Sequence, residues 1–232
     1  MKLKDMPMLP LVMIALMFAV GAYVYPHLPA QIPVHWNAAG EIDRWAQSTV
    51  WNVFAEPLMA LGFYVLFMVM PYFDPKRANI YKSKPVYFLV LDAVTALIML
   101  MFFGGLAAAF NSSVPVDRLA LAGIGLMLMV LGNYMGRVKR NWTMGVRFSW
   151  TLSDDTVWAK TNRLGGRLFF GAGALTFAGA FTPPPWGITI MLVCVVAILP
   201  ITYLYSMRLY KSRHPDQPNP SEPTIEDQLR AE

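Results

Sequence analysis

The chain has 232 residues, of which 56% are hydrophobic and 14% are charged. Soluble domains carry roughly a quarter charged residues, so this composition excludes an ordinary soluble domain and indicates a polytopic membrane protein. The formal net charge is +5, and every Lys and Arg except Arg44 and Arg118 falls on one side of the topology described below. This bias follows the positive-inside rule, so we attribute the charge to membrane orientation and expect no direct nucleic-acid partner.

Three apolar runs in the first half of the chain, at residues 6–25, 51–73 and 86–110, are long enough to cross a membrane. A hydrocarbon core of about 30 Å needs roughly 20 helical residues at about 1.5 Å each. Lys2 and Lys4 precede the first run, and no small-residue cleavage pattern follows it. We therefore predict an uncleaved first span whose amino end lies in the cytoplasm.

Residues 26–50 form a proline-rich loop that this topology places outside the cytoplasm. Trp side chains settle at membrane interfaces and anchor protein contacts, so we interpret the loop as a folded cap that recognises a peptide. The candidate recognition residues are His35, Trp36, Gly40, Asp43 and Trp45.

A metal site beside this loop is a weaker hypothesis. His35, Asp43 and Glu56 supply one imidazole and two carboxylates, which could bind a divalent ion or hold a proton facing outward. A lone histidine in a proline-rich loop is more often a hydrogen-bonded structural residue. We therefore expect no metal and no cofactor.

Glu56 and Asp92 are the only acidic residues within the predicted spans. A charge in hydrocarbon is unfavourable, so both should face the bundle and be paired, protonated or hydrated. Two interpretations stay open. One is a proton or ligand site, and the other is a structural hydrogen bond to a neighbouring helix, with Lys84 as an alternative partner for Asp92.

Three further spans are predicted at residues 119–136, 168–182 and 187–207. The second of these is short and rich in Gly and Ala, which favours close packing inside the bundle. Residues 208–232 carry prolines among polar side chains and are predicted to form a disordered cytoplasmic tail.

Residues 137–167 form a loop, here named the signature loop, that is rich in Lys, Arg and Trp. Cations favour the cytoplasmic side of a membrane, and indole rings settle at the headgroup level. Within the loop, Ser153 can cap the start of a helix and Gly165 can end it. We predict a short amphipathic helix between them, lying on the inner membrane surface.

The segment GNYMGRVKRNWTMGVRFSWTLSDDTVWAKTNRLGGR resembles the signature of the SdpI family of bacterial membrane proteins. The residues that carry the resemblance are Asn133, Asn141, Gly145, Arg147, Trp150, Thr151, Leu152, Trp158, Arg163 and Gly165. Ser149 stands where the family usually has proline, and Asn162 where it usually has histidine. The stretch LPAQIPVHWNAAGEIDRW is similar to the small domain of unknown function that often precedes this signature.

The resemblance implies an immunity protein of the bacterial cytoplasmic membrane that gives tolerance to a secreted antimicrobial peptide or protein toxin. It implies that the outer loop and the helix bundle meet the toxin and that the signature holds a cytoplasmic regulator. The basic and Trp residues of the loop at residues 137–167 predict membrane lipids as further partners. Two alternatives come from other classes. They are a membrane enzyme that uses His35, Asp43 and Glu56, and a small transporter that uses Glu56 and Asp92 for proton coupling.

The predicted fold is an all-α polytopic membrane protein with six transmembrane helices and both termini in the cytoplasm. We divide the chain into an N-terminal membrane half at residues 1–110, an SdpI-like half at residues 111–207 and the tail at residues 208–232.

Overall fold

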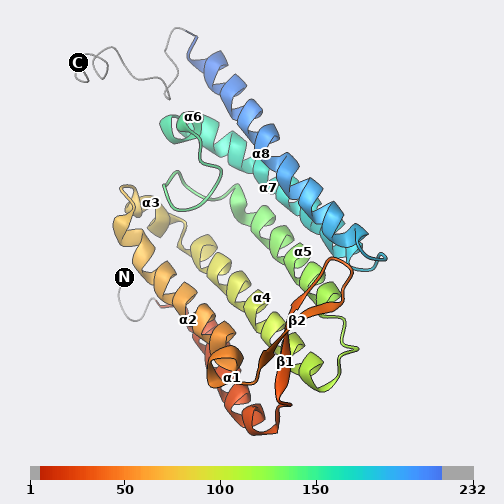
Figure 1. Ribbon diagram of the computed structural model, residues 1–232. Coiled ribbons are helices and arrows are strands. Elements are labelled where there is room, and N and C mark those ends of the chain that lie inside the picture. The colour runs from red at the N-terminus through yellow and green to blue at the C-terminus, as the bar shows by residue number, and fades with distance from the viewer. Residues whose placement is uncertain (1–5, 216–232) are drawn as a thin grey trace, which may run out of the picture.

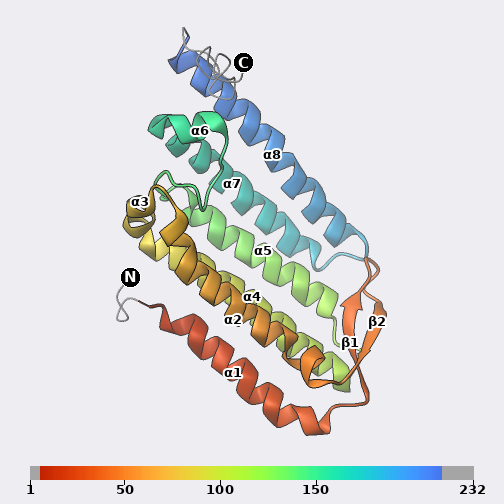
Figure 2. The ribbon, with the colours of Figure 1, turned by 60° about the vertical axis from the view of Figure 1, so that its left-hand side comes forward.

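The computed structural model describes residues 6–215 as six long helices that alternate in direction, with a β-hairpin at one end (Figure 1). The long helices are α1 (Met8–Val24), α2 (Val50–Phe73), α4 (Lys84–Phe110), α5 (Val116–Met135), α7 (Asp155–Gly179) and α8 (Trp186–Arg213). The shorter elements are η2 (Tyr25–His27), β1 (Gln31–Trp36), β2 (Ile42–Gln47), α3 (Arg77–Lys82) and α6 (Ser149–Ser153). The amino end of α1 and the carboxyl end of α8 therefore lie at the same end of the bundle, opposite the hairpin (Figure 2).

Within residues 6–215, five helices are long and apolar enough to cross a membrane. They are Met8–His27, Val50–Phe73, Lys84–Phe110, Val116–Met135 and Trp186–Arg213. The prediction of a multi-pass membrane protein is confirmed, with five spans of this kind rather than six. The helix left out is α7, because Lys160, Arg163 and Arg167 lower the hydropathy of its first half. It nevertheless packs between α5 and α8 (Figure 2).

The prediction of a separate amphipathic helix that ends at Gly165 is wrong. Residues 155–179 form one continuous helix that includes most of predicted span five. Gly165 is buried inside this helix, where α7 meets α5, instead of ending it. A glycine that ends a helix usually takes a positive φ, and among the described glycines only Gly40 and Gly145 do so.

Glycines at positions seven residues apart bring α5 and α7 into backbone contact. A Cβ atom on Gly132 would lie 2.5 Å from the Gly166 carbonyl oxygen, and one on Gly173 would lie 2.5 Å from the Gly125 carbonyl oxygen. Seven residues make about two helical turns, so both contacts fall on one face of each helix. Small residues permit such close approach in lipid. The predicted packing of the Gly- and Ala-rich segment inside the bundle is confirmed.

The first three long helices share an apolar core of their own. Met17 of α1, Ala60 of α2 and Leu91 of α4 are fully buried there.

The hydroxyl of Thr49 caps α2 by accepting a hydrogen bond from the Asn52 N–H at 3.3 Å. The hairpin connects α1 to α2 in the chain, and its strand β1 packs against α4.

The predicted outer loop is largely regular, because its middle forms an antiparallel hairpin of β1 and β2. The Asn37 side-chain oxygen accepts hydrogen bonds from the backbone N–H groups of Ala39 and Glu41 at 2.9 and 3.0 Å. Gly40 completes the turn with φ 79°, a conformation that favours glycine. These contacts give the hairpin tip one defined shape.

Helix α8 extends further than predicted. The tail was expected to begin at residue 208, but the helix continues to Arg213. Tyr210 is buried against Trp150 and Val157, and this packing holds the last turns in place. Residues 216–232 of the predicted tail lie outside the described residues.

Candidate functional site

A cavity of about 720 Å³ lies under the hairpin. Five segments line it: the hairpin, the start of α2, the end of α4, the start of α5 and the turn between α7 and α8. The polar or charged side chains in its mostly apolar wall include His35, Arg44, Asn52, Glu56, Asp117 and Arg118. A large apolar cavity with a few polar groups is the usual form of a small-molecule or peptide site.

His35 and Asp43 meet across the two strands of the hairpin. The His35 Nδ1 atom lies 2.5 Å from the Asp43 Oδ1 atom. His35 and Trp36 line the cavity, whereas Asp43 and Trp45 lie outside it. The Trp45 side chain is 47% exposed. The predicted recognition residues are thus close together on the hairpin, but of these only His35 and Trp36 line the cavity.

Gly40 fixes the hairpin tip against α5. A Cβ atom at Gly40 would lie 2.7 Å from the Asp117 Oδ2 atom. Asp117 lies in the first turn of α5 and lines the cavity. Gly40 therefore shapes the site by allowing close approach of the hairpin, and it does not itself line the cavity.

Glu56 reaches the same cavity from α2. Its carboxylate has no hydrogen-bond or ion-pair partner among residues 6–215. His35 and Glu56 therefore share a cavity, but Asp43, the third predicted metal ligand, does not line it. The described part of the chain holds no group of three or more His, Cys, Asp or Glu side chains that could bind a metal ion.

Asp92 lies apart from this site, on α4. One of its carboxylate oxygens is buried without a hydrogen-bond partner in the described structure. Asp92 lines neither the hairpin cavity nor the smaller cavity described below. Glu56 and Asp92 therefore do not form one site.

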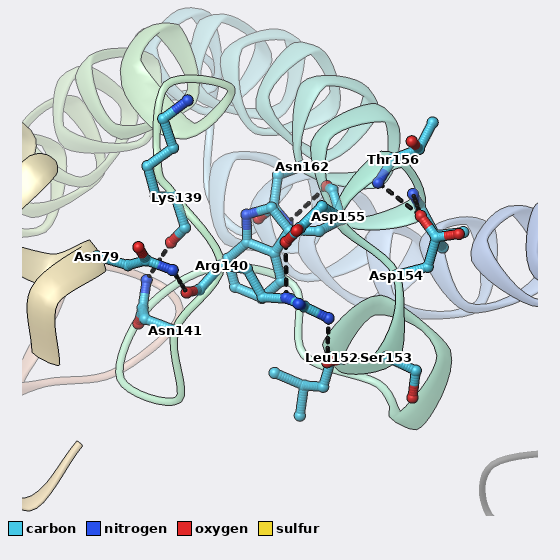
Figure 3. A network of polar contacts seen from close by, with 12 residues as sticks. Asn79, Lys139, Arg140, Asn141, Leu152, Ser153, Asp154, Asp155, Thr156 and Asn162 are labelled. Carbon is cyan, nitrogen blue, oxygen red and sulfur yellow. Dashed lines mark hydrogen bonds and ion pairs between the residues drawn. The ribbon is translucent and has the colours of Figure 1, made fainter. Parts of the chain in front are cut away.

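At the opposite end of the bundle, residues 136–154 fold into a compact unit that we name the signature cap (Figure 3). Asn141 is fully buried at its centre. Its side-chain oxygen accepts hydrogen bonds from the N–H groups of Thr143 and Met144, both at 2.8 Å, and its amide donates to the Lys139 carbonyl at 2.7 Å. Asn141 therefore sets the path of the cap backbone.

Residues of the N-terminal half hold the signature cap. The Asp74 Oδ2 atom accepts hydrogen bonds from the Trp142 N–H at 2.9 Å and the Thr143 hydroxyl at 2.7 Å. The Asn79 amide donates to the Arg140 carbonyl at 2.7 Å (Figure 3). Asp74 is buried, so both of these bonds form away from water.

Helix α7 holds the cap from the other side. The Asn162 side-chain oxygen accepts from the Val146 N–H at 2.8 Å, and its amide donates to the Trp158 carbonyl at 3.0 Å. The Trp158 indole N–H donates to the Val138 carbonyl at 2.8 Å. Gly145 has φ 112°, and a Cβ atom there would lie 2.7 Å from the Asn162 oxygen. Gly145 is therefore required both for its backbone conformation and for space.

Three more signature residues contribute to the packing of the cap, two from the cap itself and Gly165 from α7. The Trp150 indole N–H donates to the Ser206 hydroxyl of α8 at 2.7 Å. The Thr151 hydroxyl accepts from the Phe148 N–H at 2.8 Å. A Cβ atom on Gly165 would approach the Val146 side chain to 3.0 Å. These residues build the cap and are not available to a partner.

Asn133, Arg147 and Arg163 are the signature residues whose side chains are exposed. The Arg147 guanidinium donates to the Trp142 carbonyl. Asn133 and Arg163 line a second, smaller cavity between α5 and α7.

Asp154 joins the start of α7 to the end of α8. Its Oδ1 atom accepts from the N–H groups of Thr156 and Val157 at 2.6 and 2.9 Å, and its Oδ2 atom lies 3.0 Å from Arg213 Nε and 2.9 Å from His214 Nε2. Burial opposes ionisation, but the hydrogen bonds from Val157, His214, Arg213 and Thr156 outweigh it and hold the pKa of Asp154 well below its usual range.

Two protein-family models match this chain, one around the signature cap and one around the hairpin. The SdpI/YfhL protein family matches residues 137–204, and the Domain of unknown function (DUF1648) matches residues 12–61. The resemblance to the SdpI family is confirmed. The chain is also 27% identical over 201 residues to "Immunity protein SdpI" of Bacillus subtilis (strain 168), which covers 87% of this chain and 94% of that protein. No solved structure matches the chain.

The SdpI region runs from the signature cap through α7 into α8. Its two departures from the family pattern are accommodated locally. Ser149 begins α6. Asn162 is fully buried and uses both of its polar atoms in hydrogen bonds, so this position needs no titratable side chain to hold the cap.

Asp74, Asn79 and Ser83 are site residues that the sequence interpretation missed. Ser83 accepts a hydrogen bond from the Lys139 N–H at 2.9 Å, next to the Asn79 contact. One signal was present, because Asp74 is the only acidic residue in the basic stretch DPKRANIYKSKP. The SdpI signature alone does not point to it, because 68 residues separate Asp74 from Trp142.

We predict that Asp154→Asn lowers the thermal stability of the purified protein at neutral pH. Asparagine caps helices about as well as aspartate, so the loss comes from the contacts with Arg213 and His214. Because folding lowers the pKa of Asp154, its contribution is complete above pH about 5 and is lost progressively as the pH falls further. Melting curves of both proteins should therefore converge in acid.

The matched control is Asp155→Asn, whose side chain is 78% exposed beside Arg140. Because the Asp155 carboxylate is largely exposed, although the Arg140 side chain is only 18% exposed, this pair contributes roughly 1 kcal/mol and the variant should melt closer to the wild type than Asp154→Asn does. A gap for Asp154→Asn that stays constant down to pH about 2, below the pKa of an ordinary carboxylate, would contradict the assignment.

Proposed function

We propose that this chain is a membrane immunity protein that gives tolerance to a secreted antimicrobial peptide or protein toxin. The observation that carries the proposal is the similarity to the immunity protein of Bacillus subtilis over 87% of this chain. A match of this extent includes both the residues of the hairpin cavity and those of the signature cap. The similarity therefore extends over most of the chain and is not limited to one motif.

The hairpin cavity is the proposed meeting point with the toxin. Its apolar wall suits a hydrophobic segment of an antimicrobial peptide. His35 and Trp36 line this wall from the hairpin, while Trp45 on the outer face offers an aromatic anchor. Glu56 adds a carboxylate without a protein partner, which suits a cationic group.

The proposed topology has six crossings, because α7 crosses the membrane in addition to the five apolar helices, and it places the signature cap and both chain ends in the cytoplasm. Two observations support it. Helix α7 runs antiparallel to α5 and α8 between them (Figure 2). Among residues 6–215, Arg44 and Arg118 are the only Lys or Arg residues at the hairpin end of the bundle. In a Cys194→Ser background, an impermeant maleimide should label Ala39→Cys, but not Ser153→Cys, in spheroplasts. Labelling of Ser153→Cys before lysis would reverse the topology.

The immunity function is tested by complementation. A deletion strain is challenged with toxins secreted by neighbouring bacteria, with and without the wild-type gene. We expect the wild type to restore growth. Loss of protection in Arg147→Ala or in His35→Ala, at equal membrane levels, would show whether the signature cap or the hairpin is needed for protection. Equal sensitivity of deletion and complemented strains to every toxin tested would remove the proposal.

We extend the proposal to a cytoplasmic regulator that contacts the signature cap. Trp142 is 51% exposed there although it is a large aromatic side chain, and Arg147 lies beside it. Toxin-dependent changes in transcript levels should disappear in a Trp142→Ala strain that remains protected. Identical transcript responses in the deletion strain and the wild type would refute this extension.

A further inference from the structure

The second cavity, of about 270 Å³, is a groove on the side of the bundle where the end of α5 crosses α7. Gly132 and Gly166 form its floor, and both are buried in backbone contact with each other. No side chain can stand on this floor, since a Cβ atom at either glycine would lie 2.5 Å from the opposite carbonyl oxygen. The groove is therefore a fixed part of the helix crossing.

Two arginines stand over this floor. Arg163 and Arg167 are four residues apart on α7, so their side chains lie on the same face. Both are exposed, and neither has an acidic partner among residues 6–215. The nearby carboxylates of Asp154 and Asp155 are already held by other cations. The groove therefore has uncompensated positive charge.

The position of the groove along α7 matches the boundary between headgroups and hydrocarbon. Arg167 is the last charged residue of α7, and the helix is apolar from residue 168 onward. Phe170 lines the groove from this apolar part and is 45% exposed. On the α5 side, Asn133 adds an exposed amide. One groove thus offers cations, a hydrogen-bond donor and an apolar wall.

We propose that this groove binds one anionic phospholipid. Arg163 and Arg167 hold the phosphate, because the guanidinium group donates two parallel hydrogen bonds to phosphate oxygens. The Asn133 amide contacts the headgroup, and an acyl chain follows Phe170 along the outside of the bundle. Basic pockets between spanning helices are known to hold anionic lipid headgroups. The apolar wall distinguishes a lipid from a free phosphate ion.

The test uses the full chain purified in neutral detergent, with bound lipid counted by native mass spectrometry and stability followed by thermal unfolding. We expect the wild type to retain one phosphatidylglycerol and to be stabilised by it more than by phosphatidylcholine. In Arg163→Gln/Arg167→Gln the affinity for phosphatidylglycerol should fall about thirtyfold, since each basic residue near an anionic lipid contributes about 1 kcal/mol.

The matched control is Lys160→Gln/Lys211→Gln, which removes the same charge from exposed positions outside the groove. It should retain the lipid. An equal loss in the control would show a diffuse electrostatic effect and overturn the proposal.

A second variant tests the groove without changing charge. A Cβ atom on Gly136 would meet Arg163 only at ordinary contact distances, from 3.5 Å, so Gly136→Leu should fold and fill the groove. It should lose the lipid as the double arginine variant does. Retention by Gly136→Leu, or equal stabilisation of the wild type by inorganic phosphate alone, would overturn the lipid assignment.

Discussion

Replacing Gly166 with alanine is expected to disrupt the packing of α5 against α7. The added Cβ atom would lie 2.5 Å from the Gly132 carbonyl oxygen, which belongs to a helical backbone and cannot rotate away. Overpacking of a well-packed interior destabilises proteins by about 1 to 3 kcal/mol, and sometimes by more. We expect a loss near the upper end of this range, about 3 kcal/mol, because backbone rather than a flexible side chain opposes the methyl group.

Gly171→Ala is the matched control on the same helix. A Cβ atom on Gly171 meets nothing within 4 Å, so this variant should be as stable as the wild type or slightly more stable. Thermal unfolding in detergent, followed by size-exclusion chromatography, compares the two variants. Similar melting of Gly166→Ala and Gly171→Ala would show that the helices do not approach as closely as described.

Filling the hairpin cavity with Gly105→Leu is expected to abolish protection against the toxin. Gly105 lines the cavity, and a Cβ atom there meets nothing within 4 Å, so a leucine side chain can enter without displacing a neighbour. A ligand that needs this space would lose at least about tenfold in affinity, which corresponds to about 1.4 kcal/mol. The toxin concentration that inhibits growth should fall to that of the deletion strain.

Gly62→Leu makes the same change outside the cavity. Gly62 is exposed on α2, and its Cβ position is also open. This strain should stay protected when membrane levels match. Full protection by Gly105→Leu would place the toxin contact away from the hairpin cavity, even if the immunity function itself holds.

Most of the helical architecture could be predicted from the sequence because each membrane span is a local feature. The apolar runs that gave α2 and α4 match their structural bounds within two residues. Helix α7 could not be predicted in this way. Its first half is polar because it carries the signature residues, and Gly165 predicted a helix end at a position where the helix continues.

In the candidate site, too, local features could be predicted from the sequence and long-range contacts could not. Resemblance to a known signature pointed to Asn141, Gly145 and Trp158, all of which contribute to the signature cap. Their long-range partners were not visible, because the Asp74 contacts join residues 68 and 69 positions apart. The hairpin cavity was also missed, since five separate segments must fold together before it exists.

The buried carboxylate of Asp74 limits how this protein can be recombined with its relatives. A chimera that took residues 137–204 from this chain and the first helices from a distant relative would keep the Trp142 N–H and Thr143 hydroxyl as donors. Without an acid at position 74 these partly buried donors would lose their acceptor, at roughly 0.5 to 1.5 kcal/mol for each. The smallest unit that can be exchanged therefore includes the turn after α2 as well as the signature.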